Sequence, residues 1–293
     1  MNALIPSNDS AETPEIPGVS FGRSADGMDV ALVGETAFAM VPARDGRHFL
    51  ASGWRIRRPM SEWMRSDFYG HSGELADAAA FRNAVLEHAE HLREKQALGR
   101  REARIATNTP WGASQGTTIY ADGVVFHNTA GHGGFHLSDD RNGQIHQTLR
   151  ADGGWYEEDE CWAIVAIHFP HLFTSFERRC AERTLKDSWP DAFERIFGRI
   201  LGPGESRERD RIAFEKQHAG DWIVVAAITS EQEKGFVECI ATRGGKRGHV
   251  EERRFLVPST EYRVGQFGFV IDEARHRAWD GPSDFAGRRG RAA

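Results

Sequence analysis

The order in which strand-like and helix-like segments follow one another constrains the fold of this chain more than any single motif. Three short apolar runs near the N-terminus predict strands, at residues 29–33, 36–41 and 48–56. The last two flank Asp45-Gly46, a pair that supplies the positive φ of a hairpin turn. A helix is predicted next, at about residues 74–103. Its apolar side chains recur at steps of three and four, at Ala78, Phe81, Val85, Ala89 and Leu92.

Beyond this helix the chain alternates again between strands and helices. Residues 117–120 and 124–127 flank an Asp-Gly pair and predict a second hairpin, and the apolar run 162–169 predicts a buried strand. Two helices are predicted to follow, because a capping-box pattern begins at Thr174 and Pro190 suits a first helical turn. The remaining predicted strands span residues 222–229, 235–242, 253–257 and 266–271.

This order predicts an α+β fold. Neighbouring strands joined by short turns favour mostly antiparallel sheets, and the chain lacks the steady βαβ alternation of a doubly wound fold. We expect a long amphipathic helix after the N-terminal strands and a helix pair in a middle unit. The predicted segments are a disordered leader at 1–18, strands plus the long helix at 19–105, the middle unit at 106–204, antiparallel strands at 205–285 and a basic tail at 286–293.

Charge and cysteine usage exclude several classes of protein. The formal net charge of -6 argues against a protein that coats nucleic acid through a general positive field. The three cysteines form no Cys-x-x-Cys pair, which favours a reducing compartment over a disulfide framework. The first residues lack the basic and apolar regions of an export signal, and no stretch is long enough to span a bilayer. We therefore expect a cytoplasmic protein without a membrane partner.

The residues most suited to chemistry lie in a glycine-rich loop and in an acidic run. Glycines surround His132 at residues 127–136, and glycine lets a backbone approach a ligand closely while histidine donates, accepts or binds metal. Four consecutive acids follow at residues 157–160. A histidine facing such a carboxylate suits a general base or a metal site. The candidate catalytic residues are His132, His136, Glu157 and Asp159, and the candidate binding residues are Trp111, Gly133, Gly134, Tyr156, Lys246 and Arg247.

The same residues also suit an ordinary structural role, because glycines form turns, loop histidines are usually solvated and acids before a strand protect its edge. A three-histidine zinc site that includes His127 is not favoured, since the spacing lies in a loop of unknown path. His88 and His91 are expected to be surface histidines. The Gly-x-Ser-x-Gly match at residues 112–116 lacks the strand, turn and helix of a hydrolase elbow. Residues 244–248 are interpreted as a basic hairpin turn instead of a phosphate loop.

Three motifs carry a family resemblance. The TPWG sequence at residues 109–112, GHGGF at 131–135 and GWYEED at 154–159 resemble, in this order, a domain family of unknown function found in bacterial plasmid and phage accessory proteins. The similarity extends from about residue 21 to residue 285. The resemblance brings no established activity, metal, cofactor or catalytic residue. It implies a context of accessory functions that help an incoming element establish itself, including counter-defence.

These observations lead to two functional hypotheses. The first is a cytoplasmic accessory protein of a mobile genetic element that binds a host defence protein or nucleic acid, with its acidic surface imitating a nucleic-acid backbone. The alternative is a metal-dependent or His/carboxylate-dependent hydrolase or nuclease centred on the Gly-His-Gly-Gly loop. A purely structural or interaction subunit is a third option, and the oligomeric state is open. The distance from the His132 ring to the nearest acidic carboxylate distinguishes the enzyme from the others.

Overall fold

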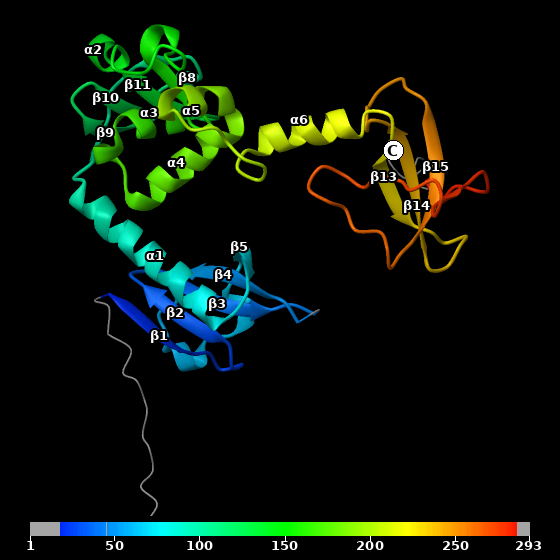
Figure 1. Ribbon diagram of the computed structural model, residues 1–293. Coiled ribbons are helices and arrows are strands. Elements are labelled where there is room, and N and C mark those ends of the chain that lie inside the picture. Colours follow the sequence, from blue (N-terminus) through cyan, green and yellow to red (C-terminus); the bar gives the residue numbers. More distant parts are fainter. Residues whose placement is uncertain (1–17, 45, 286–293) are drawn as a thin grey trace, which may run out of the picture. The chain divides into compact units, whose positions relative to one another are not determined.

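The computed structural model describes residues 18–44 and 46–285 (Figure 1). It confirms the α+β class, and every strand pair within its sheets is antiparallel. The chain divides into two compact units, Met1–Glu182 and Arg183–Ala293. The predicted leader, apart from Gly18, and the predicted tail at 286–293 lie outside the described residues. None of the helices in the described part of the chain combines the length and the apolar character that a membrane span needs.

The first unit begins with a five-stranded antiparallel meander. Its strands are β1 (Val19–Arg23), β2 (Asp29–Val33), β3 (Thr36–Pro42), β4 (His48–Trp54) and β5 (Gly70–Leu75). The strands predicted at 29–33, 36–41 and 48–56 are therefore confirmed, whereas β1 and β5 had no clear sequence signal. Side chains that alternate along β2 and β3 are buried on both faces. Trp63 and Phe68 cover one face, and Phe81 and Val85 of the following helix cover the other.

That helix, α1 (Ala78–Ala97), is shorter than the predicted 74–103. Its N-terminus is fixed by Asp77, whose carboxylate accepts a hydrogen bond from the Ala80 amide at 2.7 Å. Gly99 adopts a φ of 61°, which ends the helix. The chain then forms a short strand, β6 (Arg101–Ala103), so both ends of the predicted helix were wrong because strands flank it.

A second five-stranded sheet, hereafter the middle sheet, has the order β12-β11-β10-β9-β6. Its other strands are β9 (Gly116–Ala121), β10 (Val124–Asn128), β11 (Gly133–Leu137) and β12 (Trp155–Glu157). A separate hairpin, β7 (Asn108–Thr109) and β8 (Gly112–Ala113), carries Trp111 in its turn, and a short helix α2 (Asp139–Asn142) follows β11. The segment predicted as a glycine-rich loop is thus partly a strand, because β11 pairs on both sides with its neighbours.

Two helices follow the middle sheet. The predicted strand at 162–169 is wrong, because the structure forms helix α3 (Trp162–His168) there. Helix α4 (Ser175–Ser188) begins with the predicted capping box: the Glu177 amide donates to Thr174 Oγ1 at 3.1 Å, and the Thr174 amide donates to Glu177 Oε2 at 2.8 Å. The buried Arg100 guanidinium donates to both oxygens of Glu177, at 2.9 and 2.6 Å, and so joins the end of α1 to the start of α4.

The second unit holds the end of α4, two further helices and a four-stranded sheet. The helices are α5 (Pro190–Phe197) and α6 (Arg207–Gln217), and the strands are β13 (Trp222–Thr229), β14 (Phe236–Arg243), β15 (Glu252–Pro258) and β16 (Arg277–Ala278). The strand predicted at 266–271 is wrong. That segment makes isolated bridges from Val270 to Ile223 and from Gly268 to Gly265, and the fourth strand of the sheet lies further along the chain.

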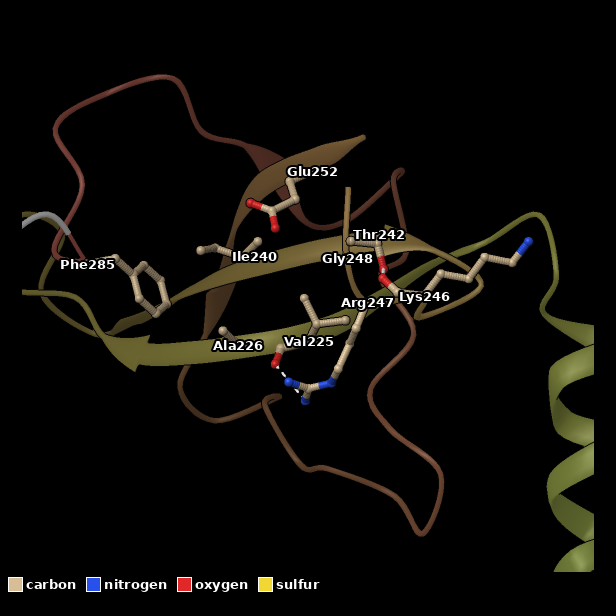
Figure 2. Close-up of a pocket in the computed structure, with 9 residues that line it drawn as sticks. All are labelled: Val225, Ala226, Ile240, Thr242, Lys246, Arg247, Gly248, Glu252 and Phe285. Carbon is tan, nitrogen blue, oxygen red and sulfur yellow. Dashed lines mark hydrogen bonds between the residues drawn. The ribbon is translucent and has the colours of Figure 1, made fainter. Parts of the chain in front are cut away.

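One buried carboxylate fixes the C-terminal segment of this unit. Glu238, on β14, is fully buried and forms an ion pair with Arg254 at 3.1 Å. Its two oxygens accept hydrogen bonds from Ser283 Oγ and the Asp284 amide, both at 2.8 Å. A buried charge needs such partners to offset its loss of hydration. The residues up to Phe285 are therefore held against the sheet, and Phe285 lies opposite Lys246 of the β14–β15 turn among the residues drawn in Figure 2.

Candidate functional site

His132 and the acidic run meet at one end of the middle sheet. His132 lies just before β11, and Glu157 is the last residue of β12. Because β11 and β12 are antiparallel neighbours, with Gly134 paired to Glu157, the start of one strand lies beside the end of the other. The antiparallel register therefore brings together side chains that are 25 positions apart in the sequence.

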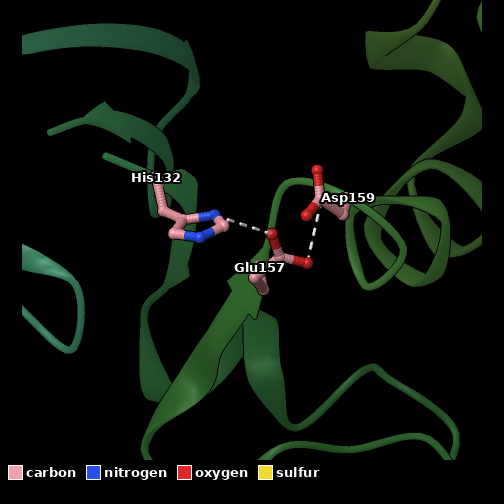
Figure 3. A group of neighbouring side chains, drawn as sticks. All are labelled: His132, Glu157 and Asp159. Carbon is pink, nitrogen blue, oxygen red and sulfur yellow. Dashed lines mark hydrogen bonds and ion pairs between the residues drawn. The ribbon is translucent and has the colours of Figure 1, made fainter. Parts of the chain in front are cut away.

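The imidazole faces two carboxylates (Figure 3). His132 Nδ1 lies 3.6 Å from Glu157 Oε1 and 3.9 Å from Glu158 Oε1. Asp159 joins the group, and one ligand atom from each of His132, Glu157 and Asp159 lies within 4.8 Å of the others. The loop that presents His132 is tight, since Thr129 Oγ1 donates to the His132 carbonyl at 2.5 Å and the Thr129 amide donates to the same oxygen at 2.8 Å.

The two oxygens of Glu157 have different surroundings. Oε2 accepts hydrogen bonds from the Asp159 and Glu160 amides, at 2.8 and 3.3 Å, so it stabilises the turn after β12. Oε1 is buried and has no hydrogen-bond partner among the described residues. A buried carboxylate oxygen without a donor is costly, and such an atom calls for an explanation. The oxygen that lacks a donor is the one that faces His132.

The glycines of the loop allow close approach, but the protein's own side chains occupy the space. A Cβ on Gly133 would lie 2.5 Å from Glu158 Oε2, and a Cβ on Gly134 would overlap the Trp111 ring and lie 2.5 Å from the Tyr156 carbonyl oxygen. Trp111 therefore covers the backbone of β11, and its ring meets Trp155 edge-on with centroids 5.8 Å apart. Glycine at 133 and 134 lets Glu158 and Trp111 pack directly on this strand.

His136 and His127 lie on the same sheet but outside the cluster. His136 stacks on its cross-strand partner Trp155, with centroids 4.2 Å apart. His127 is almost fully buried, and its Nδ1 lies 3.1 Å from Ser114 Oγ. Burial lowers the pKa of both histidines, so both rings are neutral near pH 7. The structure brings together His132, Glu157 and Asp159 of the predicted catalytic set, and it places His136 in an aromatic stack.

The serine of the Gly-x-Ser-x-Gly match does contact a histidine, which the sequence did not indicate. Ser114 lies between β8 and β9, however, without the following helix of a hydrolase elbow, and its hydroxyl donates to the Gly116 carbonyl at 3.2 Å. In this setting the Ser114–His127 contact holds the β8–β9 connection onto the middle sheet. The prediction that the motif is a chance match is consistent with this arrangement.

Other predicted residues lie elsewhere. Tyr156 alternates with Glu157 along β12 and is buried on the opposite face, where its hydroxyl donates to Asn142 Oδ1 at 2.6 Å. Lys246 and Arg247 belong to the second unit and are not part of this cluster. His88 and His91 are half-buried on α1: His88 packs edge-on against Phe38, and His91 Nδ1 lies 2.8 Å from Thr174 Oγ1. The expectation of surface histidines there was wrong, because α1 packs on both the first sheet and α4.

The donor set fits a divalent cation. One imidazole nitrogen and two carboxylates are ligands that zinc and manganese accept, and the adjacent Glu158 adds negative charge. His132 has a side-chain exposure of 55% and Glu157 one of 27%, so the cluster combines a buried oxygen with an open side towards solvent. Exposed acidic residues also occur without metal, and the Glu157 Oε1 atom is what sets this group apart from an ordinary acidic surface.

Comparison with known families places this site inside a recognised domain. Residues 104–219 match the model of a domain of unknown function, DUF7007. The matched range covers less than half of the chain and includes the middle sheet with His132, Glu157 and Asp159. It supports the expected membership of this part in a family of unknown function. No curated protein and no solved structure matches the chain.

Proposed function

We propose that the middle sheet carries a metal-dependent hydrolase site in which His132, Glu157 and Asp159 bind a divalent cation. The observation that carries this proposal is the buried Glu157 Oε1, which has no hydrogen-bond donor among the described residues and lies 3.6 Å from His132 Nδ1. A cation between these atoms would satisfy the oxygen and offset its desolvation. A proton bound to Oε1 is the alternative to a metal ion, and metal titration distinguishes the proton from the cation.

The residues around the cluster suit hydrolysis. A bound divalent cation supplies Lewis-acid polarisation of a substrate and activation of water. The exposed His132 and Asp159 leave the outer side of the cluster open, so a substrate can reach it. Glu158 Oε1 lies 3.9 Å from His132 Nδ1 and is positioned to accept a proton, while Oε2 of the same carboxylate lies against Gly133. Trp111 of the β7–β8 turn and Trp155 of β12 form an apolar wall beside Gly134 of β11.

Metal binding tests the proposal directly. Protein stripped with a chelator is titrated with Zn²⁺ and Mn²⁺ by isothermal titration calorimetry, and we expect one site per chain. His132→Ala and Glu157→Gln should each weaken binding by at least roughly tenfold, because each removes a ligand. The matched controls are His171→Ala and Glu160→Gln. His171 and Glu160 are exposed residues of the same region whose side chains lie outside the cluster. Equal binding by the variants and the controls would contradict the proposal.

Activity is tested on the metal-loaded full chain. Phosphodiester, phosphomonoester and carboxylic ester substrates that release a chromophore are assayed beside labelled single-stranded and double-stranded DNA. We expect metal-dependent turnover of one class, and a loss of about a hundredfold in Glu158→Gln with metal affinity retained, in line with removal of a general base. Turnover that persists in the presence of chelator, or in His132→Ala, would overturn the enzyme proposal.

We also propose the cellular setting that the motif resemblance implies: a cytoplasmic accessory protein of a plasmid or phage that binds a host defence protein or nucleic acid. The TPWG, GHGGF and GWYEED motifs and the net charge of -6 support this second proposal. Affinity capture of the tagged full chain from host lysate, together with gel-shift assays at low salt, tests it. The proposal would be contradicted if the capture yields no specific host protein and the gel-shift assays show no retained nucleic acid.

A further inference from the structure

The sheet of the second unit is hollowed beside the β14–β15 turn. The groove has a volume of about 480 Å³ and is lined by side chains of β13, β14 and β15, by the turn residues Lys246 and Arg247 and by Phe285 (Figure 2). This volume falls in the range of small-ligand sites, about 300–1,000 Å³, and suits one nucleotide. Lys246 and Phe285 lie at opposite ends, as Figure 2 shows.

The turn end of the groove carries two unneutralised cations. Lys246 and Arg247 are both exposed, and within the described residues neither forms an ion pair. Neighbouring arginines differ, because Arg243 and Arg253 both contact Glu273. The Arg247 guanidinium donates to the Val225 carbonyl at 3.3 Å, which turns it across the groove. The two cations are therefore available for an anion.

The rest of the groove combines apolar surface with one acceptor. Ile240 and Val225 form apolar lining, and the Phe285 ring lies at the far end, held there by the Glu238 bonds to Ser283 and Asp284. The Glu252 carboxylate lies beside Ile240 (Figure 2). An aromatic ring and apolar side chains suit a planar base, and a carboxylate accepts hydrogen bonds from the amino group of cytosine. A site that binds only a small anion would gain nothing from the negatively charged Glu252.

We propose that this groove binds one nucleotide of a single-stranded nucleic acid. The phosphate contacts Lys246 and Arg247, the base lies on Phe285 and Ile240, and Glu252 accepts from its amino group. This inference deepens the nucleic-acid form of the binding proposal. It is independent of the metal site, which belongs to the other unit.

Fluorescence anisotropy with the full chain tests the phosphate contacts. Labelled 15-mers of deoxycytidine and deoxythymidine are titrated at about 50 mM salt. We expect the double variant Lys246→Gln/Arg247→Gln to bind at least roughly tenfold more weakly and to lower the salt slope by about 0.7, the value for one phosphate that is no longer neutralised. The matched control is Lys234→Gln/Arg263→Gln, which removes two exposed cations of the same unit that do not line the groove. Thermal melts verify that both double variants fold.

Each outcome distinguishes the groove from other ways of binding. The groove inference is overturned if the test and control variants lose equal affinity, or if the test variant binds as tightly as the parent chain. Either result means that the nucleic acid binds elsewhere on the protein, and the nucleic-acid proposal itself stands. No binding of either 15-mer at low salt overturns both the groove and the nucleic-acid proposal. Free cytidine monophosphate that competes as well as the 15-mer, nucleotide for nucleotide, overturns the assignment to a strand.

Base preference tests the role of Glu252. We expect the deoxycytidine 15-mer to bind about tenfold more tightly than the deoxythymidine 15-mer, because thymine presents a carbonyl oxygen where cytosine presents an amino group. Glu252→Gln should bring the ratio close to one, since an amide serves both bases. Removing the negative charge of Glu252 strengthens the binding of both 15-mers alike, so it does not change the ratio of their affinities. A ratio that Glu252→Gln leaves unchanged would exclude this residue from base contact.

Discussion

At the scale of single residues, Gly134 decides how the side chains beside the candidate site pack. Gly134 lets Trp111 lie directly on the backbone of β11, and no larger residue fits without moving that ring or the Tyr156 carbonyl of the paired strand. We predict that Gly134→Ala destabilises the full chain by about 1–3 kcal/mol, the usual range for overpacking. Urea denaturation followed by tryptophan fluorescence measures the change, because Trp111 and Trp155 both report on this region.

The matched control is Gly131→Ala, three residues earlier in the same loop. A Cβ on Gly131 meets no atom within 4 Å, so this substitution should change stability by less than about 0.5 kcal/mol. Similar destabilisation by both substitutions would mean that loop flexibility, and not the contact with Trp111, is what matters at Gly134.

The composition of the candidate site was partly predictable from single residues. The sequence identified a histidine among glycines and an acidic run, and the structure brings His132, Glu157 and Asp159 together. It gave no sign that His136 stacks on Trp155 or that Trp111 fills the space beside Gly134, because both depend on the cross-strand register. The glycines favour close approach in either case, whether the approaching group is a ligand or a neighbouring side chain.

At the scale of elements, α3 shows why the strand predicted from the apolar run at 162–169 was wrong. Its residues 163–166 are buried all round, and a short run that is apolar on every side has no period that separates a strand from a helix.

The last residue of α3, His168, makes two hydrogen bonds through its imidazole ring. His168 Nδ1 donates to the Ile164 carbonyl at 2.7 Å, and its Nε2 accepts from the His146 amide at 3.0 Å. The bond that Nε2 accepts requires the neutral ring, because a protonated Nε2 cannot accept, whereas Nδ1 donates to Ile164 in either charge state.

We predict a pH-dependent stability from this contact. Burial lowers the pKa of His168 below its ordinary value near 6.5, although the bond to Ile164 opposes the shift. On acidification the unfolded chain therefore binds the proton first. The stabilisation is complete above about pH 6.5 and is lost as the pH falls through that value towards the folded-state pKa. Urea denaturation between pH 7.5 and 5 should show the fall, and His168→Gln should make it shallower.

Other histidines contribute in the same direction, since burial also lowers the pKa of His88, His91, His127 and His136. The comparison must therefore be between slopes. His171→Gln, an exposed position in the turn after α3, is the control and should leave the slope unchanged. If both glutamine variants keep the parent slope, His168 is not a source of the acid sensitivity.

At the scale of the whole molecule, one buried ion pair joins the N-terminal part of the first unit to its later helices. The Arg100 side chain is 7% exposed, and its guanidinium lies over the Tyr120 ring at 4.0 Å while it bonds Glu177. Burial alone would raise the pKa of Glu177, but its hydrogen bonds with Arg100 and with the Thr174 amide outweigh burial and lower it. The contact therefore favours the charged carboxylate of Glu177.

We predict that Arg100→Ala destabilises the first unit by about 3–5 kcal/mol, because it leaves the Glu177 carboxylate without its cation. Arg93→Ala, which removes an exposed partner of Glu90 on α1, should cost at most about 0.5 kcal/mol. Urea denaturation, with hydrogen exchange followed in α1 and α4, measures both. Comparable losses would show that removing a positive charge in or just after α1 matters more than the buried contact.

The α+β class was predictable from the order of segments. The sequence indicated breaks near residues 105 and 204, where turns and glycines occur, whereas the compact units meet at Glu182 and Arg183, inside α4. A continuous amphipathic helix carries no turn residue at such a point, so composition gives no signal there. The fold class depended on strand and helix order alone, and that order survives errors in single elements such as α3.

The bonds of Glu238 set a limit on how far the chain can be trimmed. A stop codon after Phe285 would keep Ser283 and Asp284, and the carboxylate would retain all of its donors. A stop codon before Ser283 would leave a charge in the sheet interior with Arg254 as its remaining partner. Truncation and tagging at this end of the chain should therefore start beyond residue 285.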